Sequence, residues 1–244
     1  MNTIKPIDQS FSAAIFENDL ESAARLLTQG ADINRVSLTT QPDERGVYED
    51  TTTYLLEATL RGHTETVRFL LENGADPNFA GKFAGQTALL AAARCGHVEI
   101  VDLLLLHGAD FSAADHPSKF TAMEYAVSGE NPRIVRSLLA AGAKPVFRRF
   151  SFNREGGSAA CDILRMIMDH GFDINRRDDW GRTPLMWAAE RAPLETVQFL
   201  LDSGADVNII SGKNMNGVSS EETALLLARR AGREDVVNLL LQRR

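Results

Sequence analysis

The chain has 244 residues, of which 44% are hydrophobic and 24% charged; this composition supports a buried core and excludes a disordered or low-complexity protein. The formal net charge of −7 disfavours nucleic acid or an anionic membrane as the main target. The charge is uneven, since residues 1–110 carry 8 Lys or Arg against 16 Asp or Glu, and residues 111–244 carry 18 against 17.

Two features indicate the compartment. Cys95 and Cys161 lie within helical patterns and not in a CxxC pair, which fits a reducing environment. The first residues contain no apolar run of signal-peptide length, and no segment approaches the roughly eighteen apolar residues of a membrane span. We therefore expect a soluble, cytoplasmic protein with no membrane contact.

One phrase recurs along the chain, a pair of large aliphatic residues followed by Gly-Ala-Asp or a close variant. It reads LLTQGADIN (26–34), LLENGADPN (70–78), LLLHGADFS (104–112), LLAAGAKPV (138–146), IMDHGFDIN (167–175) and LLDSGADVN (200–208). The glycines of successive copies are 44, 34, 34, 29 and 33 residues apart. The sequence therefore contains an internal repeat with a period near 33 residues. One interval between copies is longer than this period and one is shorter.

A second phrase lies between these copies, a Thr followed by a short apolar segment, at 53–63, 87–97, 121–131, 183–193 and 223–233. Each repeat is predicted to hold two short helices. In the copy at 87–112, Thr87 is suited to cap the first helix, Gly96 to end it and Gly108 to end the second. A two-helix unit of this size cannot bury its own apolar face, so the units must stack on one another.

These phrases resemble the ankyrin repeat, whose T-P-L-H-x-A signature is matched most fully by DDWGRTPLMWAA at 178–189. The resemblance implies an all-α solenoid of about seven helix-turn-helix units with β-turn fingers. We expect residues 1–10 to form an N-terminal tail and residues 11–244 a single ankyrin-repeat domain. The expected units span about 11–34, 51–78, 85–112, 119–145, 146–175, 179–208 and 221–244, with finger insertions at 36–50 and 209–220. The unit at 146–175 is degenerate because it lacks a Thr-Pro-Leu helix.

Signals of catalysis are absent from the sequence. His63 and His97 occupy the same position in successive repeats, and Cys95 lies at the end of a short predicted helix, where an inert thiol is expected. The chain contains no P-loop, GxGxxG, HExxH or GxSxG motif. We therefore expect no enzyme activity, no cofactor and no metal, and a function that depends on surface recognition.

The ankyrin resemblance implies that a partner protein binds a concave groove built from the first helices and from the fingers before each Thr. The candidate residues in the regular repeats are aromatic or charged. They are Phe83, Lys119, Phe120, Arg177, Asp179, Trp180, Arg182, Glu190 and Arg191. Aromatic and Arg side chains supply much of the binding energy at interfaces. The aromatic rings also fit a second role, in which they fold back over the helix ends.

Irregular segments add further candidates. The acidic finger at 36–50 contributes Asp43, Glu44, Tyr48 and Glu49, although it also fits a surface insertion without a partner. The segment at 146–157 contributes Arg148 and Arg149 as a basic site, while its phenylalanines replace the apolar face of the missing helix. The finger at 209–220 contributes Met215.

The function predicted from these features is a non-catalytic protein–protein interaction module, monomeric when free. The alternative is an inhibitor or immunity protein that masks the active site of a toxin or enzyme. A partner with a basic surface would complement the acidic first half of the chain in either case.

Overall fold

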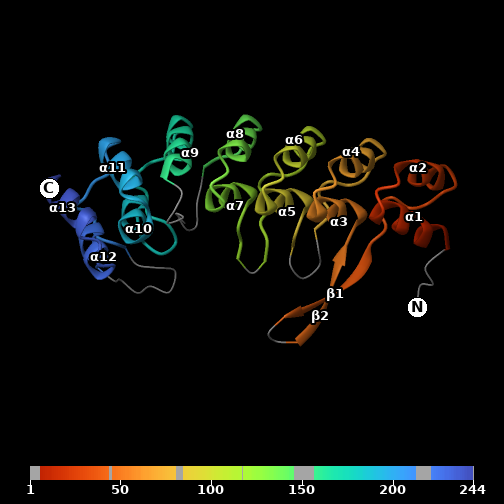
Figure 1. Ribbon diagram of the computed structural model, residues 1–244, viewed down its shortest axis with the longest axis horizontal. Coiled ribbons are helices and arrows are strands. Elements are labelled where there is room, and N and C mark those ends of the chain that lie inside the picture. Colours follow the sequence, from red (N-terminus) through yellow and green to blue (C-terminus); the bar gives the residue numbers. More distant parts are fainter. Residues whose placement is uncertain are drawn as a thin grey trace. The chain divides into compact units, whose positions relative to one another are not determined.

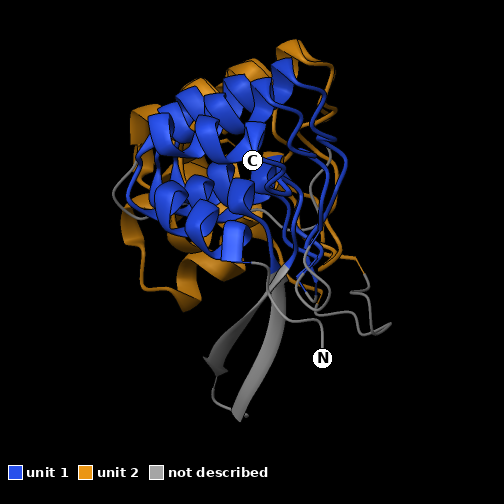
Figure 2. Cartoon of the chain, turned by 90° about the vertical axis from the view of Figure 1, so that its right-hand side faces the viewer, with its two compact units in different colours: residues 1–122 blue, residues 123–244 orange. Residues whose placement is uncertain are grey.

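The computed structural model describes residues 6–43, 46–80, 85–116, 118–145, 157–212 and 221–243, with the backbone alone for 37–43 and 46–51. The chain divides into two compact units, residues 1–122 and residues 123–244 (Figure 2). The assignment of residues 11–244 to one domain remains a prediction.

Unit 1 contains three pairs of short helices. They are α1 (Pro6–Phe16) with α2 (Leu20–Thr28), α3 (Tyr54–Arg61) with α4 (Thr64–Glu72), and α5 (Ala88–Cys95) with α6 (Val98–Leu106). The first helices α1, α3 and α5 form one layer and the second helices α2, α4 and α6 form the other (Figure 1). The acidic finger contains an antiparallel hairpin of β1 (Ser37–Asp43) and β2 (Gly46–Thr52), in which Gln41 lies opposite Tyr48.

Unit 2 follows the same plan with one exception. Its helices are α7 (Ala122–Ser128), α8 (Pro132–Ala140), α9 (Gly157–Asp169), α10 (Pro184–Arg191), α11 (Leu194–Asp202), α12 (Ala224–Arg230) and α13 (Glu234–Gln242). Helix α9 contacts α8 and α11, which are both second helices, so it occupies the second-helix layer (Figure 1). Within the described part of the degenerate unit, residues 157–175, α9 is the only helix.

Threonine caps start the first helices as the sequence predicts. The hydroxyl oxygens of Thr53, Thr87, Thr183 and Thr223 each accept a hydrogen bond from the backbone N–H three residues later. Gly96 ends α5 with φ of 78°, in the left-handed region where a side chain is strained. The paired helices and their caps confirm the predicted all-α repeat fold.

Stacking of neighbouring pairs forms the core within each unit. Ala91 and Ala92 of α5 are fully buried, and their small side chains let α3 and α5 pack closely. Leu70 and Leu104 fill the space beneath the second helices of unit 1, and Leu138 and Leu200 do the same in unit 2. Close packing of this kind removes from water an apolar face that no single pair covers.

Asparagine side chains join successive turns through the backbone. The Asn34 side chain donates to Gly74 O (3.1 Å) and accepts from Asp76 N (2.8 Å). Asn78 makes the same two bonds with Gly108 O (3.1 Å) and Asp110 N (2.7 Å). In unit 2, Asn175 bridges to Gly204 O and Asp206 N. Each bridge satisfies a helix-terminal carbonyl and fixes the next turn.

The N-terminal helix begins earlier than expected. Residues 1–10 were predicted to be a tail, but α1 starts at Pro6. The carboxylate of Asp8 is buried in an ion pair with Arg35 (2.5 Å), and Tyr54 Oη donates to the Asp8 carbonyl (3.3 Å). Burial, followed by the charge of Asp8, raises the pKa of Tyr54. A buried acidic residue interrupts the apolar pattern, which is why the sequence conceals this first turn.

Two helix-end glycines allow a matched test of the stacking. A methyl group at Gly74 (φ +88°) meets nothing within 4 Å, whereas one at Gly62 (φ +72°) lies 2.9 Å from His97 Cε1 of the next pair. We expect Gly74→Ala to lower the free energy of unfolding by about 1 kcal/mol through backbone strain alone. Gly62→Ala should cost more, because His97 must also move. Urea unfolding of both variants checks this, and equal losses would contradict the contact.

The asparagine bridges predict a second stability difference. Asn78→Ala removes both bonds to the following turn, so the free energy of unfolding should fall by about 1–2 kcal/mol. Asn208→Ala is the control. Asn208 bonds to Asp206 Oδ1 through its backbone N–H, and alanine retains that group. Thermal denaturation of the two variants distinguishes a bridge from a general effect of losing an asparagine.

Candidate functional site

The finger before α10 is organised by one buried carboxylate, Asp178. Its Oδ1 accepts from the backbone N–H groups of Trp180 (2.9 Å) and Arg182 (3.0 Å), and its Oδ2 accepts from Trp187 Nε1 (2.7 Å). A carboxylate that accepts several N–H groups holds a turn in one conformation. Asp178 therefore fixes the finger against the helix that follows it.

Trp187 lies on α10 between two arginines. The guanidinium carbon of Arg182 is 4.8 Å from the centre of the Trp187 ring system, and that of Arg191 is 5.7 Å away. Both distances allow attraction between a cation and the face of an aromatic ring. The indole is itself buried, so it supports the two arginine side chains rather than contacting solvent widely.

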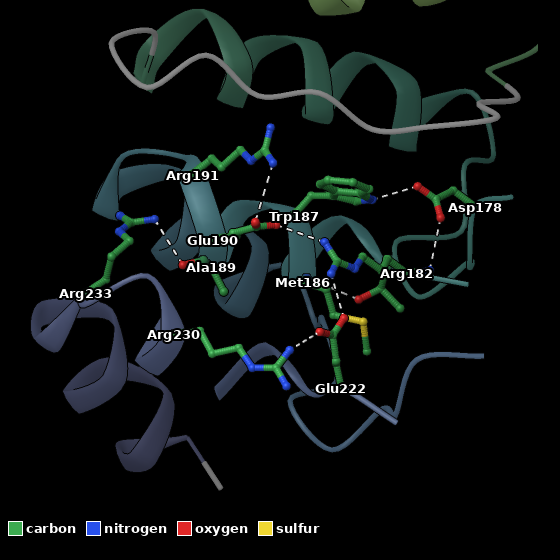
Figure 3. A network of polar contacts seen from close by, with 11 residues as sticks. Asp178, Arg182, Met186, Trp187, Ala189, Glu190, Arg191, Glu222, Arg230 and Arg233 are labelled. Carbon is green, nitrogen blue, oxygen red and sulfur yellow. Dashed lines mark hydrogen bonds and ion pairs between the residues drawn. The ribbon is translucent and has the colours of Figure 1, made fainter. Parts of the chain in front are cut away.

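Charged side chains continue from Trp187 to the next repeat as an alternating row (Figure 3). Arg182 pairs with Glu190 (2.9 Å) and with Glu222 (2.6 Å), and Glu222 also pairs with Arg230. We call Asp178, Arg182, Trp187, Glu190, Glu222 and Arg230 the Trp187 cluster. Arg230 is the most exposed charged side chain among these ion pairs, at 61%, whereas the side chains of Glu222, Arg182 and Glu190 are 6%, 19% and 26% exposed.

The finger before α10 is joined to the start of the next finger, and we call residues 177–182 and 209–212 the finger pair. Arg177 donates from Nε (3.2 Å) and Nη2 (2.9 Å) to Ile210 O, and Gly212 N donates to Gly181 O (2.8 Å). A methyl group at Gly181 would lie 2.5 Å from Gly212 O, so the two backbones touch. The joined fingers leave Trp180 48% exposed and Ile210 52% exposed.

The structure gathers six of the predicted site residues in unit 2. Trp180 and Arg191 are exposed, Arg182 belongs to the Trp187 cluster, and Arg177 holds the finger pair together. The remaining two are Asp179, beside Trp180, and Glu190, within the cluster.

Two predicted residues lie in unit 1. Lys119 is exposed with φ of 57°, and Phe120 is half-buried, with its backbone N–H donating to Asp115 Oδ1 (2.7 Å). The partial burial of Phe120 favours the second role predicted for its ring, which is to fold back over a helix end.

The other predicted residues fall where side chains are not described. Asp43, Tyr48 and Glu49 lie on β1 and β2, where the structure gives the backbone alone. The residues outside the described ranges are Glu44, Phe83, Arg148, Arg149 and Met215. Their contacts with a partner remain predictions.

Several residues of this site were missed in the sequence. Asp178 was passed over for its neighbour Asp179, and Trp187 was treated as part of the repeat signature. A helical signal was available for Trp187, because positions 187, 190 and 191 share one face of a helix. Arg230 and Arg233 were not among the candidates, but Arg230 pairs with Glu222, and Arg233 donates to the carbonyls of Ala188 (2.8 Å) and Ala189 (3.2 Å) in the last turns of α10.

The described residues were searched for cysteines and for clusters of metal-ligating side chains. Cys161 is buried, and burial raises the pKa of its thiol, which lowers the thiolate fraction. Cys95 is exposed on α5. Within the described ranges no group of three His, Cys, Asp or Glu side chains is placed to hold a metal ion. A search of the same residues finds no helix with the length and apolarity that a membrane crossing requires.

Comparison with known proteins identifies the class. A family model described as ankyrin repeats (3 copies) matches residues 11–115, 55–149 and 155–211, and one described as ankyrin repeats (many copies) matches residues 185–241. The chain belongs to the ankyrin repeat family. Ankyrin repeats are protein–protein interaction modules, so this is the broad class of function that the fold carries.

Individual relatives share parts of this array. The chain is 37% identical over 151 residues to E3 ubiquitin-protein ligase XBAT32 of Arabidopsis thaliana, a match that covers 62% of this chain and 29% of the ligase. It is 33% identical over 166 residues to probable E3 ubiquitin-protein ligase XBOS33 of Oryza sativa subsp. japonica, covering 63% of this chain and 32% of that protein. The matches therefore span about a third or less of these relatives.

A solved structure matches nearly the whole chain. The crystal structure of the human ASB11 ankyrin repeat domain has a TM-score of 0.67 and 26% sequence identity, and the match covers 99% of this chain and 98% of that domain. This likeness agrees with the repeat fold predicted from the sequence.

The Trp187 cluster predicts a difference between its two glutamates. Glu222→Gln removes a buried charge that pairs with two arginines, so the free energy of unfolding should fall by roughly 1–3 kcal/mol. Glu190→Gln should cost less than about 1 kcal/mol, because Glu190 is more exposed and Arg182 keeps Glu222. Chemical denaturation measures both, and a larger loss at Glu190 would contradict the described pairing.

Proposed function

We propose that this chain is a non-catalytic binding module that holds a partner protein against the fingers and first helices of its repeats. In the ankyrin resemblance these elements line the concave groove. The observation that carries the proposal is the exposed Trp180. Its backbone N–H donates to Asp178, and the carbonyl of the next residue, Gly181, accepts from Gly212 N. A large side chain on a backbone that is already fixed loses less conformational freedom on binding than one on a flexible loop.

Side-chain types on the same surface support the proposal. Arg191 lies beside the Trp187 ring and is 62% exposed, and Ile210 is exposed on the finger segment that bonds to the finger of Trp180. Trp and Arg are enriched among the residues that dominate binding energy at protein interfaces. Buried ion pairs beneath them hold the surface in place without contributing to the contact area.

A narrower function is inhibition of an enzyme or toxin by covering its active site. The unequal charge favours this candidate, because the 16 acidic against 8 basic residues of positions 1–110 would attract a basic partner and speed association. Its test is direct: the purified chain should abolish the activity of the partner that it captures, at an equimolar ratio. Undiminished activity in the complex would leave only the general binding role.

The general proposal is tested on the partner captured by the full chain from its native source. Trp180→Ala should weaken the purified complex at least about tenfold by calorimetry, because it removes a fixed aromatic contact. Leu106→Ala is the matched control, since Leu106 is 79% exposed on the second helix α6 and lies outside the proposed surface. Equal affinities of wild type and Trp180→Ala would overturn the proposal for this surface, and turnover of a substrate by the pure chain would overturn its non-catalytic part.

A further inference from the structure

The finger and first-helix surface of unit 2 differs in charge from the chain as a whole. Residues 176–192, 209–212 and 221–233 contain seven arginines and five acidic residues, although the net charge of the chain is −7. Two of the five acidic residues, Asp178 and Glu222, are buried within the Trp187 cluster. The charge that this surface presents to solvent is therefore more positive than its composition indicates.

Two of the exposed guanidinium groups border the Trp187 cluster. Arg191 and Arg230 are 62% and 61% exposed, and each forms one ion pair with the cluster, with Glu190 (3.5 Å) and Glu222 respectively. A guanidinium has five N–H donors in a planar fork that fits a carboxylate. One ion pair occupies only part of this fork, so each exposed guanidinium retains N–H donors for an incoming anion.

Exposed apolar side chains lie on the fingers that precede α10 and α12, the two helices that carry these cations. Trp180 precedes Arg182 by two residues, and Arg182 packs against the Trp187 ring opposite Arg191. Ile210 is brought next to this finger by the bonds from Arg177. The surface thus combines a fixed apolar contact with a pair of cations, which is a combination suited to a segment that is both acidic and apolar.

We propose that this surface binds an extended acidic segment of a partner protein, in which carboxylates flank a large apolar side chain. The carboxylates pair with Arg191 and Arg230, and the apolar side chain packs on Trp180 and Ile210. This inference rests on the proposed binding function and specifies its partner.

The two acidic residues that lie outside the Trp187 cluster limit the orientation of the segment. Asp179 is half-buried beside Trp180, and Glu221 is exposed beside the buried Glu222. Carboxylates of the partner are therefore expected over α10 and α12 rather than over the finger tips, where the apolar side chain belongs. A nucleic acid is a weaker candidate for the occupant, because the chain carries a net charge of −7 and its finger tips present Trp180 and Ile210.

The test uses the full chain and a library of phage-displayed random dodecapeptides. We expect the selected peptides to be enriched in Asp and Glu around one Leu, Ile, Phe or Trp. A fluorescein-labelled selected peptide should bind the Arg191→Gln/Arg230→Gln double variant at least about tenfold more weakly than wild type. Changing its acidic residues to amides should weaken binding to wild type and have little further effect on the double variant, as coupled partners require.

Controls separate charge at this surface from charge in general. The control variant Arg165→Gln/Arg243→Gln removes two other exposed arginines. Arg165 lies on α9 and Arg243 lies at the end of α13, both in the second-helix layer. This variant should bind the peptide with an affinity within about twofold of wild type. Melting temperatures of both double variants establish that each is folded. Enrichment of basic peptides, or equal affinity of wild type and Arg191→Gln/Arg230→Gln, would overturn the inference.

The outcomes also distinguish this inference from the function on which it rests. Loss of the captured partner in Trp180→Ala, together with normal binding by Arg191→Gln/Arg230→Gln, would retain the binding module and reject the acidic segment. Failure of the chain to bind any protein or peptide would reject both. Binding of a single-stranded oligonucleotide with the same dependence on the two arginines would reject the peptide in favour of nucleic acid.

Discussion

The constraint on which this structure depends is that a pair of eight- or nine-residue helices cannot cover its own apolar side. Each pair is stable only against its neighbours, so every contact that sets the spacing between pairs matters to the whole unit. Alanines in the first helices let the pairs approach, and leucines beneath the second helices fill the remaining space. Asparagine bridges then fix one turn to the next through backbone groups that helix ends would otherwise leave without partners.

The interactions that set the spacing of the repeats in unit 2 also prepare its candidate site. Glu222 belongs to the last helix pair, yet it holds Arg182 of the pair before it, and Arg182 in turn packs on Trp187. Asp178 fixes the finger and the indole with one carboxylate. The residues that stabilise the stack therefore also support the candidate surface, and its exposed side chains stand on a layer of buried polar contacts.

Local features of the fold were predictable from the sequence, because they depend on residues a few positions apart. Thr87 and Gly96 were recognised as the start and end of a helix, and the structure places both in those roles. The asparagine bridges were not predicted, because Asn78 meets Asp110 only when two repeats are stacked in register. Helix α1 was placed too late, since Asp8 is stabilised by Arg35, which lies far along the chain.

The candidate site was predictable only in part, for the same reason. Exposed finger residues such as Trp180 follow from their position before a repeat signature. The pairing of Arg182 with Glu222 joins residues 40 positions apart, and no periodic pattern identifies which acidic residue an arginine will meet. Asp178 and Trp187 were overlooked because each resembles an ordinary member of the repeat, and their roles follow from side-chain hydrogen bonds.

The backbone contact between Gly181 and Gly212 provides a criterion for reading related sequences. Because even a methyl group at position 181 would overlap the Gly212 carbonyl, neighbouring turns can meet main chain to main chain only where glycine is kept. A homologue with a larger residue there must hold these turns apart and would display a differently shaped tip. Under the proposed function, the identity of this one small residue separates relatives that keep the same finger surface from those that share only its architecture.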